Sequence, residues 1–282
     1  MNRSARAALI LCVGLAGTLV ACDPEAEGCL DFRARTVDVT ASVACDDCCA
    51  YPTLTLQWLP VRFAPDTVER LGRDDVAAFA GDTLSEPQLG FYLHDIALER
   101  ADGSLYPLTD TLTVVGVVEG EDRALRDVSL VRVLPYRAAN NELGTLLESV
   151  SVVALRASVG LPADLAGADV ELQPTTSPLA SDRDSLVASE RLGLRAAGLR
   201  GRWSGAPDSV EVQIAGVGAE VRWALPASVD LARSEDLVLT LGFPVDALAQ
   251  AAAEQITAGE LTGGRFVELV VEPIRVIDAT TR

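Results

Sequence analysis

Short segments in which apolar and polar residues alternate recur along most of the chain. In the segment 53–63, for example, Leu54, Leu56 and Trp58 alternate with polar residues and fall on one side of an extended strand. Several segments are rich in β-branched residues, which strands favour. We predict strands at 36–43, 53–63, 88–100, 111–118, 127–134, 149–159, 209–215, 220–225, 237–243 and 266–277. Many short strands at this spacing predict an all-β sandwich or barrel.

Helical character is limited to two places. Residues 245–256 follow a proline and are rich in alanine, which predicts a short helix near the C-terminus. A second short helix is expected at 74–80. The stretch 160–207 contains several prolines and glycines without a clear period, and we predict loops with short pieces of regular structure there. Residues 101–104 contain a glycine and predict a tight turn between strands.

The first residues have the pattern of a bacterial export signal. Two arginines precede the apolar run 7–21, which is too short to span a bilayer. The run ends in Leu-Val-Ala-Cys at 19–22, which resembles the lipobox of lipoproteins. We therefore expect residues 1–21 to be a signal peptide and Cys22 to become a lipid-modified N-terminus. The chain would then be anchored in the cell envelope, facing the periplasm or the cell surface. Ordinary secretion with a free Cys22 is the alternative.

Charge narrows the set of partners. Residues 22–35 are acidic and predict a tether that leads into a domain at 36–282. The whole chain has a net charge of −18, which repels nucleic acid and anionic lipid but admits cations and basic partners. The sequence contains no lysine, so Schiff-base and P-loop lysine chemistry are excluded.

Four cysteines follow Cys22, namely Cys29, Cys45, Cys48 and Cys49. In an oxidising compartment an even set predicts two disulfides. Adjacent cysteines rarely pair with each other, so we favour Cys29 with one member of the cluster and Cys45 with Cys48. Two other interpretations stay open. One is a redox dithiol, which the two aspartates between Cys45 and Cys48 disfavour; the other is a thiolate site for copper or zinc, which an oxidising compartment disfavours.

His94 is the single histidine of the chain. In a strand it shares a face with Tyr92, and it is interpreted either as a partly buried strand residue or as a metal ligand. One histidine excludes the H-E-x-x-H motif, and the chain has no G-x-S-x-G motif. Carboxylates are abundant, but no pair is singled out for glycoside hydrolysis. We therefore expect no catalytic residues and no enzyme activity.

Three motifs occur in a recognisable order. They are Phe-Tyr-Leu-His-Asp-Ile at 91–96 with its Asp-Gly turn at 102–103, Leu-Arg-Ala-Ser-Val-Gly-Leu-Pro at 155–162, and Leu-Val-Leu-Thr-Leu-Gly-Phe-Pro-Val-Asp-Ala-Leu at 237–248. In order and spacing they resemble the MbnP-like family of periplasmic proteins, which is associated with methanobactin-type copper-uptake operons. The resemblance that they indicate covers roughly residues 36–277.

The resemblance implies an immunoglobulin-like antiparallel β-sandwich and a copper site. It also implies a di-haem peroxidase-like partner that oxidises a tryptophan beside the metal. His94 is the residue at a matching motif position that could ligate copper. The tryptophan-rich segment of the family would follow Leu179, where this chain has leucines instead, and further histidines are missing. The metal site implied for this chain is thus degenerate.

Two functions are expected from these observations. One is a lipid-anchored binding module in copper handling or in docking of the di-haem peroxidase-like partner. The alternative is a structural or adhesive envelope lipoprotein that has neither metal nor catalysis.

Lipid modification gives the first testable prediction. Cells grown with labelled palmitate are expected to incorporate the label at Cys22, because the leader presents that cysteine as the new N-terminus. Intact mass of the mature protein, with and without reduction, checks lipidation and disulfide number together. An unlabelled protein that stays in the cytosol would contradict the prediction.

Overall fold

The computed structural model describes residues 25–72, 76–108, 111–118, 121–126, 130–133, 140–162, 165, 168–181, 188–189, 193–206, 209–214 and 218–282. The chain divides into two compact units, one ending at Tyr51 and the other comprising Pro52–Arg282. The leader 1–21 and Cys22 lie outside the described residues. Within the described ranges, no helix has the length and apolar character needed to cross a membrane.

The unit that ends at Tyr51 has little regular structure. Strand β1 (Glu27–Gly28) pairs in parallel with β2 (Val43–Ala44), and η1 (Asp46–Cys48) is a single 3-10 turn. The sequence placed the start of the main domain at residue 36, whereas the structure groups residues up to Tyr51 with the cysteine unit.

The strand predicted over 36–43 is wrong, because only its last residue belongs to β2. The side chain of Asp38 reverses the chain instead: its Oδ1 accepts hydrogen bonds from the backbone nitrogen of Thr40 at 2.8 Å and from the Thr40 hydroxyl at 2.6 Å. Such turns compete locally with strand pairing. Val39 is consequently 77% exposed, so the apolar alternation here does not mark a buried face.

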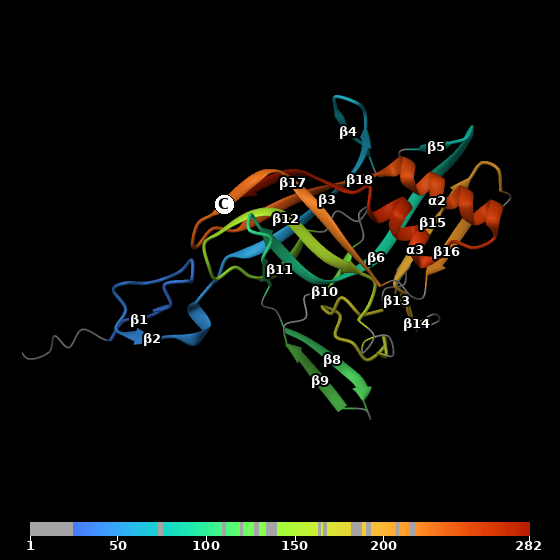
Figure 1. Cartoon of the computed structure of the whole chain (residues 1–282). Helices are drawn as coiled ribbons and strands as arrows, with labels where there is room; N and C mark the ends of the chain where they lie inside the picture. Colours follow the sequence, from blue (N-terminus) through green and yellow to red (C-terminus); the bar gives the residue numbers. More distant parts are fainter. Residues whose placement is uncertain are drawn as a thin grey trace, which may run out of the picture. The chain divides into compact units, whose positions relative to one another are not determined.

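The unit Pro52–Arg282 is a β-sandwich (Figure 1). The strands of its larger sheet are β5 (Ala77–Phe79), β6 (Asp82–Arg100), β7 (Leu105–Pro107), β10 (Leu130–Val133), β12 (Val150–Val159), β15 (Ala197–Trp203), β16 (Ser209–Ile214) and β17 (Ala219–Leu231). Their order is β16-β15-β6-β12-β17, with β5, β7 and β10 also paired to β6. The 19-residue strand β6 is therefore the centre of this sheet.

The smaller sheet closes the sandwich. Its strands are β3 (Thr53–Phe63), β4 (Val68–Arg70), β11 (Asn141–Thr145), β18 (Leu237–Pro244) and β19 (Arg275–Thr281). Their order is β11-β3-β18-β19, with β4 paired to β3. Strands β3 and β18 lie side by side although they are far apart in the sequence (Figure 1), and they pair in parallel; the other pairs of this sheet are antiparallel. Two smaller hairpins are β8 (Thr111–Val118) with β9 (Glu121–Arg126), and β13 (Ala188–Ser189) with β14 (Gly193–Leu194).

The all-β prediction is confirmed, and most of the predicted strands are present. The helix predicted at 74–80 is wrong where the structure describes it, because Ala77–Phe79 forms β5 and pairs with the start of β6. Both turn residues between them, Ala80 and Gly81, have positive φ angles of 52° and 90°. This geometry matches a tight hairpin and not a helix end.

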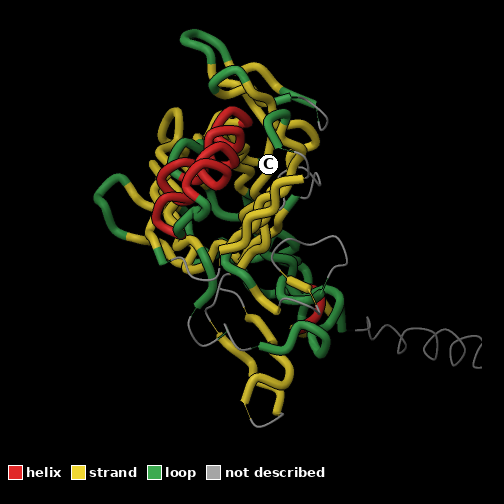
Figure 2. Tube along the Cα trace, turned by 90° about the vertical axis from the view of Figure 1, so that its right-hand side faces the viewer, coloured by secondary structure: helices red, strands yellow, loops and turns green. Residues whose placement is uncertain are grey.

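The C-terminal region contains more helix than the sequence indicated. Helix α2 (Val245–Ala258) confirms the predicted helix and ends at Gly259, which has a φ of 77°. The strand predicted over 266–277 is wrong in its first half. There α3 (Gly263–Phe266) continues into a five-residue π-helical turn, η3 (Val267–Val271), before β19 begins. Figure 2 shows these helices together in red.

An aromatic cluster joins the two sheets to the C-terminal helical region. The Trp58 ring on β3 lies edge-on to Phe91 on β6, with centroids 5.9 Å apart, and to Trp223 on β17, at 6.4 Å. Phe91 in turn contacts Phe266, with centroids 6.4 Å apart. Removing a buried phenylalanine from a packed core costs about 3–5 kcal/mol. The cluster therefore fixes the sheet whose outer face carries the sites described next.

Candidate functional site

Strand β6 is covered on both faces over its middle part. Phe91 and Leu93 point into the sandwich core, whereas Tyr92 belongs to a second apolar cluster on the outer face. The other buried residues of that cluster are Val114, Leu130, Leu165, Ala168, Val170, Leu179, Ala188 and Leu194. The Tyr92 hydroxyl donates to the carbonyl of Pro178 at 3.1 Å, and burial raises the pKa of Tyr92 to about 12. The described residues between 165 and 194, which we call the loop region, thus cover the middle of the outer face.

Two β-bulges interrupt β6, and each holds an acidic residue at positive φ. Glu86 and Asp95 both have a φ of 51°, in the left-handed region. At the first bulge, Glu86 and Pro87 lie opposite the single residue Gly201 of β15. At the second, Asp95 and Ile96 lie opposite one residue of β12. Bulges redirect side chains, and strained backbone of this kind gathers at functional sites.

His94 lies immediately before the second bulge. Its side chain is 12% exposed, and its Nδ1 lies 2.8 Å from Oδ2 of Asp95. The residues opposite it on the neighbouring strands are Leu130 and Ser158. Within the described ranges, no three side chains of histidine, cysteine, aspartate or glutamate gather closely enough to hold a metal ion.

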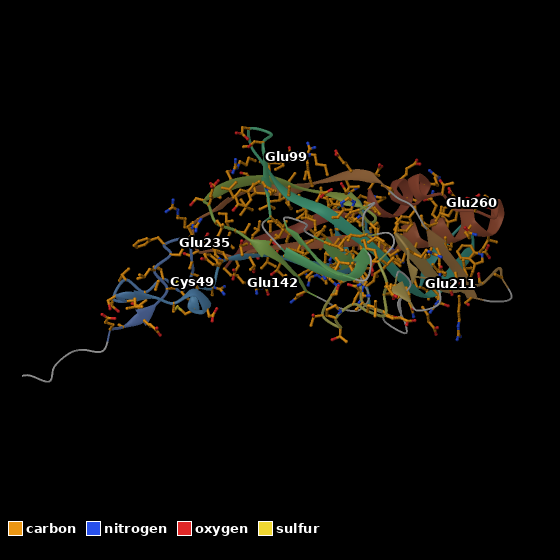
Figure 3. All side chains as sticks on the ribbon, turned by 90° about the horizontal axis from the view of Figure 1, so that it is seen from below. Cys49, Glu99, Glu142, Glu211, Glu235 and Glu260 are labelled. Atoms are coloured by element: carbon orange, nitrogen blue, oxygen red, sulfur yellow. A yellow bond between two sulfur atoms is a disulfide. The ribbon has the colours of Figure 1, made fainter. Side chains whose placement is uncertain are left out.

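The four candidate cysteines are paired in the unit that ends at Tyr51. Disulfides join Cys29 to Cys49 and Cys45 to Cys48, with Cα atoms 5.0 and 5.7 Å apart. Cys49 is labelled in Figure 3. This is the pairing that the sequence favoured, and in it all four sulfur atoms are joined in disulfides.

A charged triad occupies the outer face beyond the second bulge. Arg156 and Arg222 are direct cross-strand neighbours on β12 and β17, and the carboxylate of Glu99 lies between them. Arg222 donates to both oxygens of Glu99 at 2.8 and 2.9 Å, and Arg156 donates to Oε2 at 2.6 Å. These hydrogen bonds, first those from Arg222, lower the pKa of Glu99 to about 2. The triad neutralises part of the repulsion between two like charges and so has a structural role.

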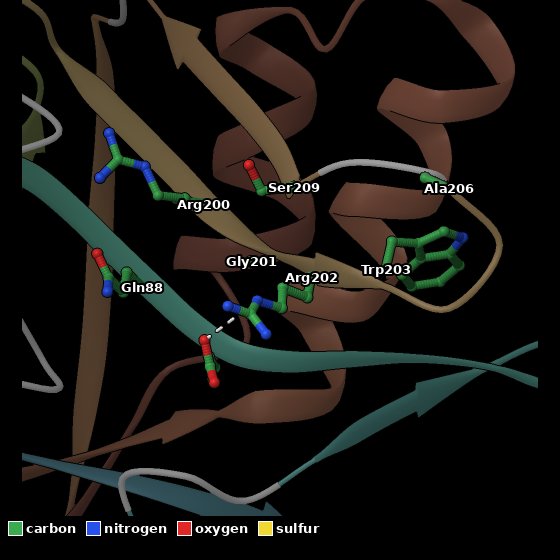
Figure 4. A pocket seen from close by; sticks show the side chains of 8 residues that line it. Gln88, Arg200, Gly201, Arg202, Trp203, Ala206 and Ser209 are labelled. Atoms are coloured by element: carbon green, nitrogen blue, oxygen red, sulfur yellow. Dashed lines mark ion pairs between the residues drawn. The ribbon is translucent and has the colours of Figure 1, made fainter.

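A polar groove lies on the outer face at the first bulge (Figure 4). We call it the bulge groove; its volume is about 690 Å³, and its lining residues are Glu86, Gln88, Arg200, Gly201, Arg202, Trp203, Ala206 and Ser209. Arg202 Nε lies 3.5 Å from Oε2 of Glu86, an ion pair drawn as the dashed line in Figure 4. Arg200 is paired directly with Gln88 across the strands, which places both side chains on the same face.

The lining residues offer two guanidinium groups, a carboxylate, an amide and a hydroxyl. Neither histidine nor cysteine is among these eight lining residues. The chemistry of the groove is hydrogen bonding and ion pairing on a sheet that a packed core supports. Sequence reasoning missed this groove, although Pro87 within an otherwise regular strand is a known sign of a bulge.

Comparison with known proteins adds one distant similarity. No protein-family model matches this chain, and no curated protein sequence matches it either. Among solved structures, MbnP from Methylosinus trichosporium is similar, with 14% sequence identity and a TM-score of 0.31. The similar region covers 71% of this chain and 78% of that protein. No residue role is transferred from it.

The Glu99 triad predicts how stability depends on pH. The pKa of Glu99 is lowered in the folded state from its ordinary 4.5 to about 2. Its stabilising contribution is therefore fully present above pH 4.5 and is lost as the pH falls towards 2. Glu99→Gln is expected to lower the urea midpoint at neutral pH, because two arginines lose their shared anion. The difference from the unchanged protein should shrink between pH 4.5 and 2.

Tryptophan fluorescence checks this prediction, because all three tryptophans lie in the unit Pro52–Arg282. The matched control is Glu142→Gln, at an exposed position on β11. Superimposable midpoint profiles for the Glu99 and Glu142 variants would show that the triad does not stabilise the fold.

Proposed function

We propose that this chain is a lipid-anchored binding module of the bacterial cell envelope, without catalysis of its own. The observation that carries the proposal is the bulge groove, which gathers polar and charged groups on a rigid sheet and has no histidine or cysteine among its eight lining residues. The lipobox-like leader supports the envelope location. The two disulfides agree with an oxidising compartment.

The charges of the bulge groove indicate the kind of ligand. Arg200 and Arg202 outnumber the single carboxylate of Glu86 in its lining, although the whole chain has a net charge of −18. Arg202 pairs with Glu86 and Arg200 pairs with Glu211 outside the lining, but the two arginine side chains stay 73% and 38% exposed. Guanidinium groups recognise carboxylates and similar planar anions through paired hydrogen bonds. We assign the groove to an anionic group on an envelope partner. A di-haem peroxidase-like protein, the partner implied by the sequence resemblance, is one candidate.

Site-directed photo-crosslinking in intact cells tests this function. A photoreactive residue in place of Gln88 is expected to trap a discrete partner, whereas the same residue in place of exposed Glu142 on the other sheet is not. Replacing both Arg200 and Arg202 by glutamine should reduce the Gln88 adduct about tenfold, because charge-assisted hydrogen bonds are lost. Equal adducts at both positions, or none at either, would favour the structural or adhesive alternative.

Copper handling is a second candidate, and one observation favours it. The Nδ1 of His94 is held against the Asp95 carboxylate at 2.8 Å, which is the usual arrangement around a metal-ligating histidine. When Nδ1 carries the proton that it shares with Asp95, Nε2 has the lone pair that can bind a metal ion. One imidazole does not complete a copper site, so the other donors would have to be residues of this chain outside the described ranges.

Copper titration of the purified protein tests this candidate. One equivalent of copper is expected to bind, and His94→Ala should abolish binding. Asp95→Asn should weaken binding by about 10–100-fold, because the carboxylate that orients His94 is lost. Asparagine tolerates the positive φ at this position, so the backbone should be unchanged. Glu142→Gln serves as the control. The candidate is rejected if copper stays at background, or if His94→Ala binds it as well as the unchanged protein.

A further inference from the structure

Strand β16 forms one edge of the larger sheet. One side of it pairs with β15 along its whole length, from Ala197 opposite Ile214 to Arg202 opposite Ser209. Among the strands that the structure describes, none pairs with its other side. In an antiparallel pair, every second residue directs its N–H and C=O away from the partner. The outer side of β16 therefore presents a row of backbone donors and acceptors.

The two edges of this sheet differ in how they are protected. At the opposite edge, β17 contains the exposed Pro226, which has no N–H, and its pairing with β12 is interrupted by a bulge at Val152/Ala154. Proline and bulges are common devices that keep an edge from pairing with another chain. Strand β16 contains no proline, and its pairing with β15 has no bulge. Its edge is thus open to a further strand.

A groove runs along this open edge. We call it the edge groove; its volume is about 420 Å³, and its lining residues are Glu211, Val212, Gln213, Ile214, Gln255, Gly259, Glu260, Leu261, Thr262 and Gly263. Four consecutive residues of β16 form one wall, and the end of α2 with the connection to α3 forms the other. Glu211 and Glu260 are seen at the same end of the unit in Figure 3.

The edge groove has an apolar floor and an acidic rim. Val212, Ile214 and Leu261 are 4%, 5% and 5% exposed and belong to the main core. Glu211 and Glu260 are exposed, and no arginine is among the ten lining residues. Arg200 offsets the charge of Glu211 from outside this lining at 3.1 Å, so the excess negative charge of the groove comes from Glu260.

We propose that the edge groove binds an extended basic segment of a partner protein by adding it as a strand to β16. Four strand residues correspond to about 13 Å, enough for a segment of about four residues. Its backbone would pair with the open edge of β16. Apolar side chains on one face would cover Val212 and Ile214, and arginine or lysine side chains would reach Glu211 and Glu260.

Charge selects this occupant over two others. A second copy of the chain would bring together two molecules that each have a net charge of −18. The acidic segment at 23–35 of the same chain would meet carboxylates in the groove. A basic segment meets no such repulsion. The two grooves have different lining residues, but Arg200 of the bulge groove pairs with Glu211 of the edge groove at 3.1 Å. Among the described residues Glu260 has no such link, so a Glu260 variant tests the edge groove independently.

A fluorescent peptide with alternating valine and lysine or arginine is the probe for this proposal. Its binding to the full purified protein, followed by anisotropy, is expected to weaken about tenfold in Glu260→Arg, because a favourable ion pair becomes a repulsion. Glu142→Arg makes the same charge change on an exposed residue of the smaller sheet and should leave the affinity nearly unchanged. Hydrogen exchange should show new protection at 209–214 when the peptide is bound.

Peptides N-methylated at alternate positions test strand addition itself. Methylation of one alternate set of amides should abolish binding, and methylation of the other set should preserve it, because only one set faces β16. The proposal is overturned if both methylated peptides bind equally. It is also overturned if Glu142→Arg weakens binding as much as Glu260→Arg does, or if the protein alone forms a dimer that protects 209–214.

Discussion

Burial of β6 on both faces is the constraint on which the rest of the structure depends. Phe91 on the inner face joins the aromatic cluster between the sheets, and Tyr92 on the outer face lies beneath the loop region. A strand held from both sides cannot shift its register, because a slip by one residue would exchange its two faces. The bulges at Glu86 and Asp95 are therefore kept in place, and with them the polar groups on the outer face.

The outer face carries arginine–glutamate ion pairs at both ends, one buried and one exposed. At one end, Glu99 is 7% exposed, and its carboxylate accepts hydrogen bonds from two arginines within the fold. At the other end, Arg202 and Glu86 are 73% and 60% exposed at their side chains and lie 3.5 Å apart. An exposed pair of this kind contributes little to stability. Its groups can therefore turn to a ligand, which is why the bulge groove and not the Glu99 triad is the candidate binding site.

Local sequence patterns correctly predicted those elements in which the local apolar period and the tertiary packing favour the same secondary structure. The alternation over 53–63 matches β3, and the alanine-rich segment after Pro244 matches α2. The run at 266–271 failed, because continuous apolar sequence fits a buried helix as well as a strand, and packing against α2 decided for helix. The segment 36–43 failed because the Asp38 side chain offered the backbone a competing turn. Strand β15 was missed within a glycine-rich stretch, where pairing with β6 outweighs weak local preference.

The sequence by itself determined the all-β class, most of the strands, the favoured disulfide pairing and the negative charge that limits the partners. These follow from residue type and short-range spacing. Only the tertiary structure decided where Gly201 meets the bulge at Glu86 and which strand becomes an open edge. It also decided that Glu260 lies across a groove from Glu211. These features depend on pairing between residues far apart in the chain, and no local period records which strands become neighbours.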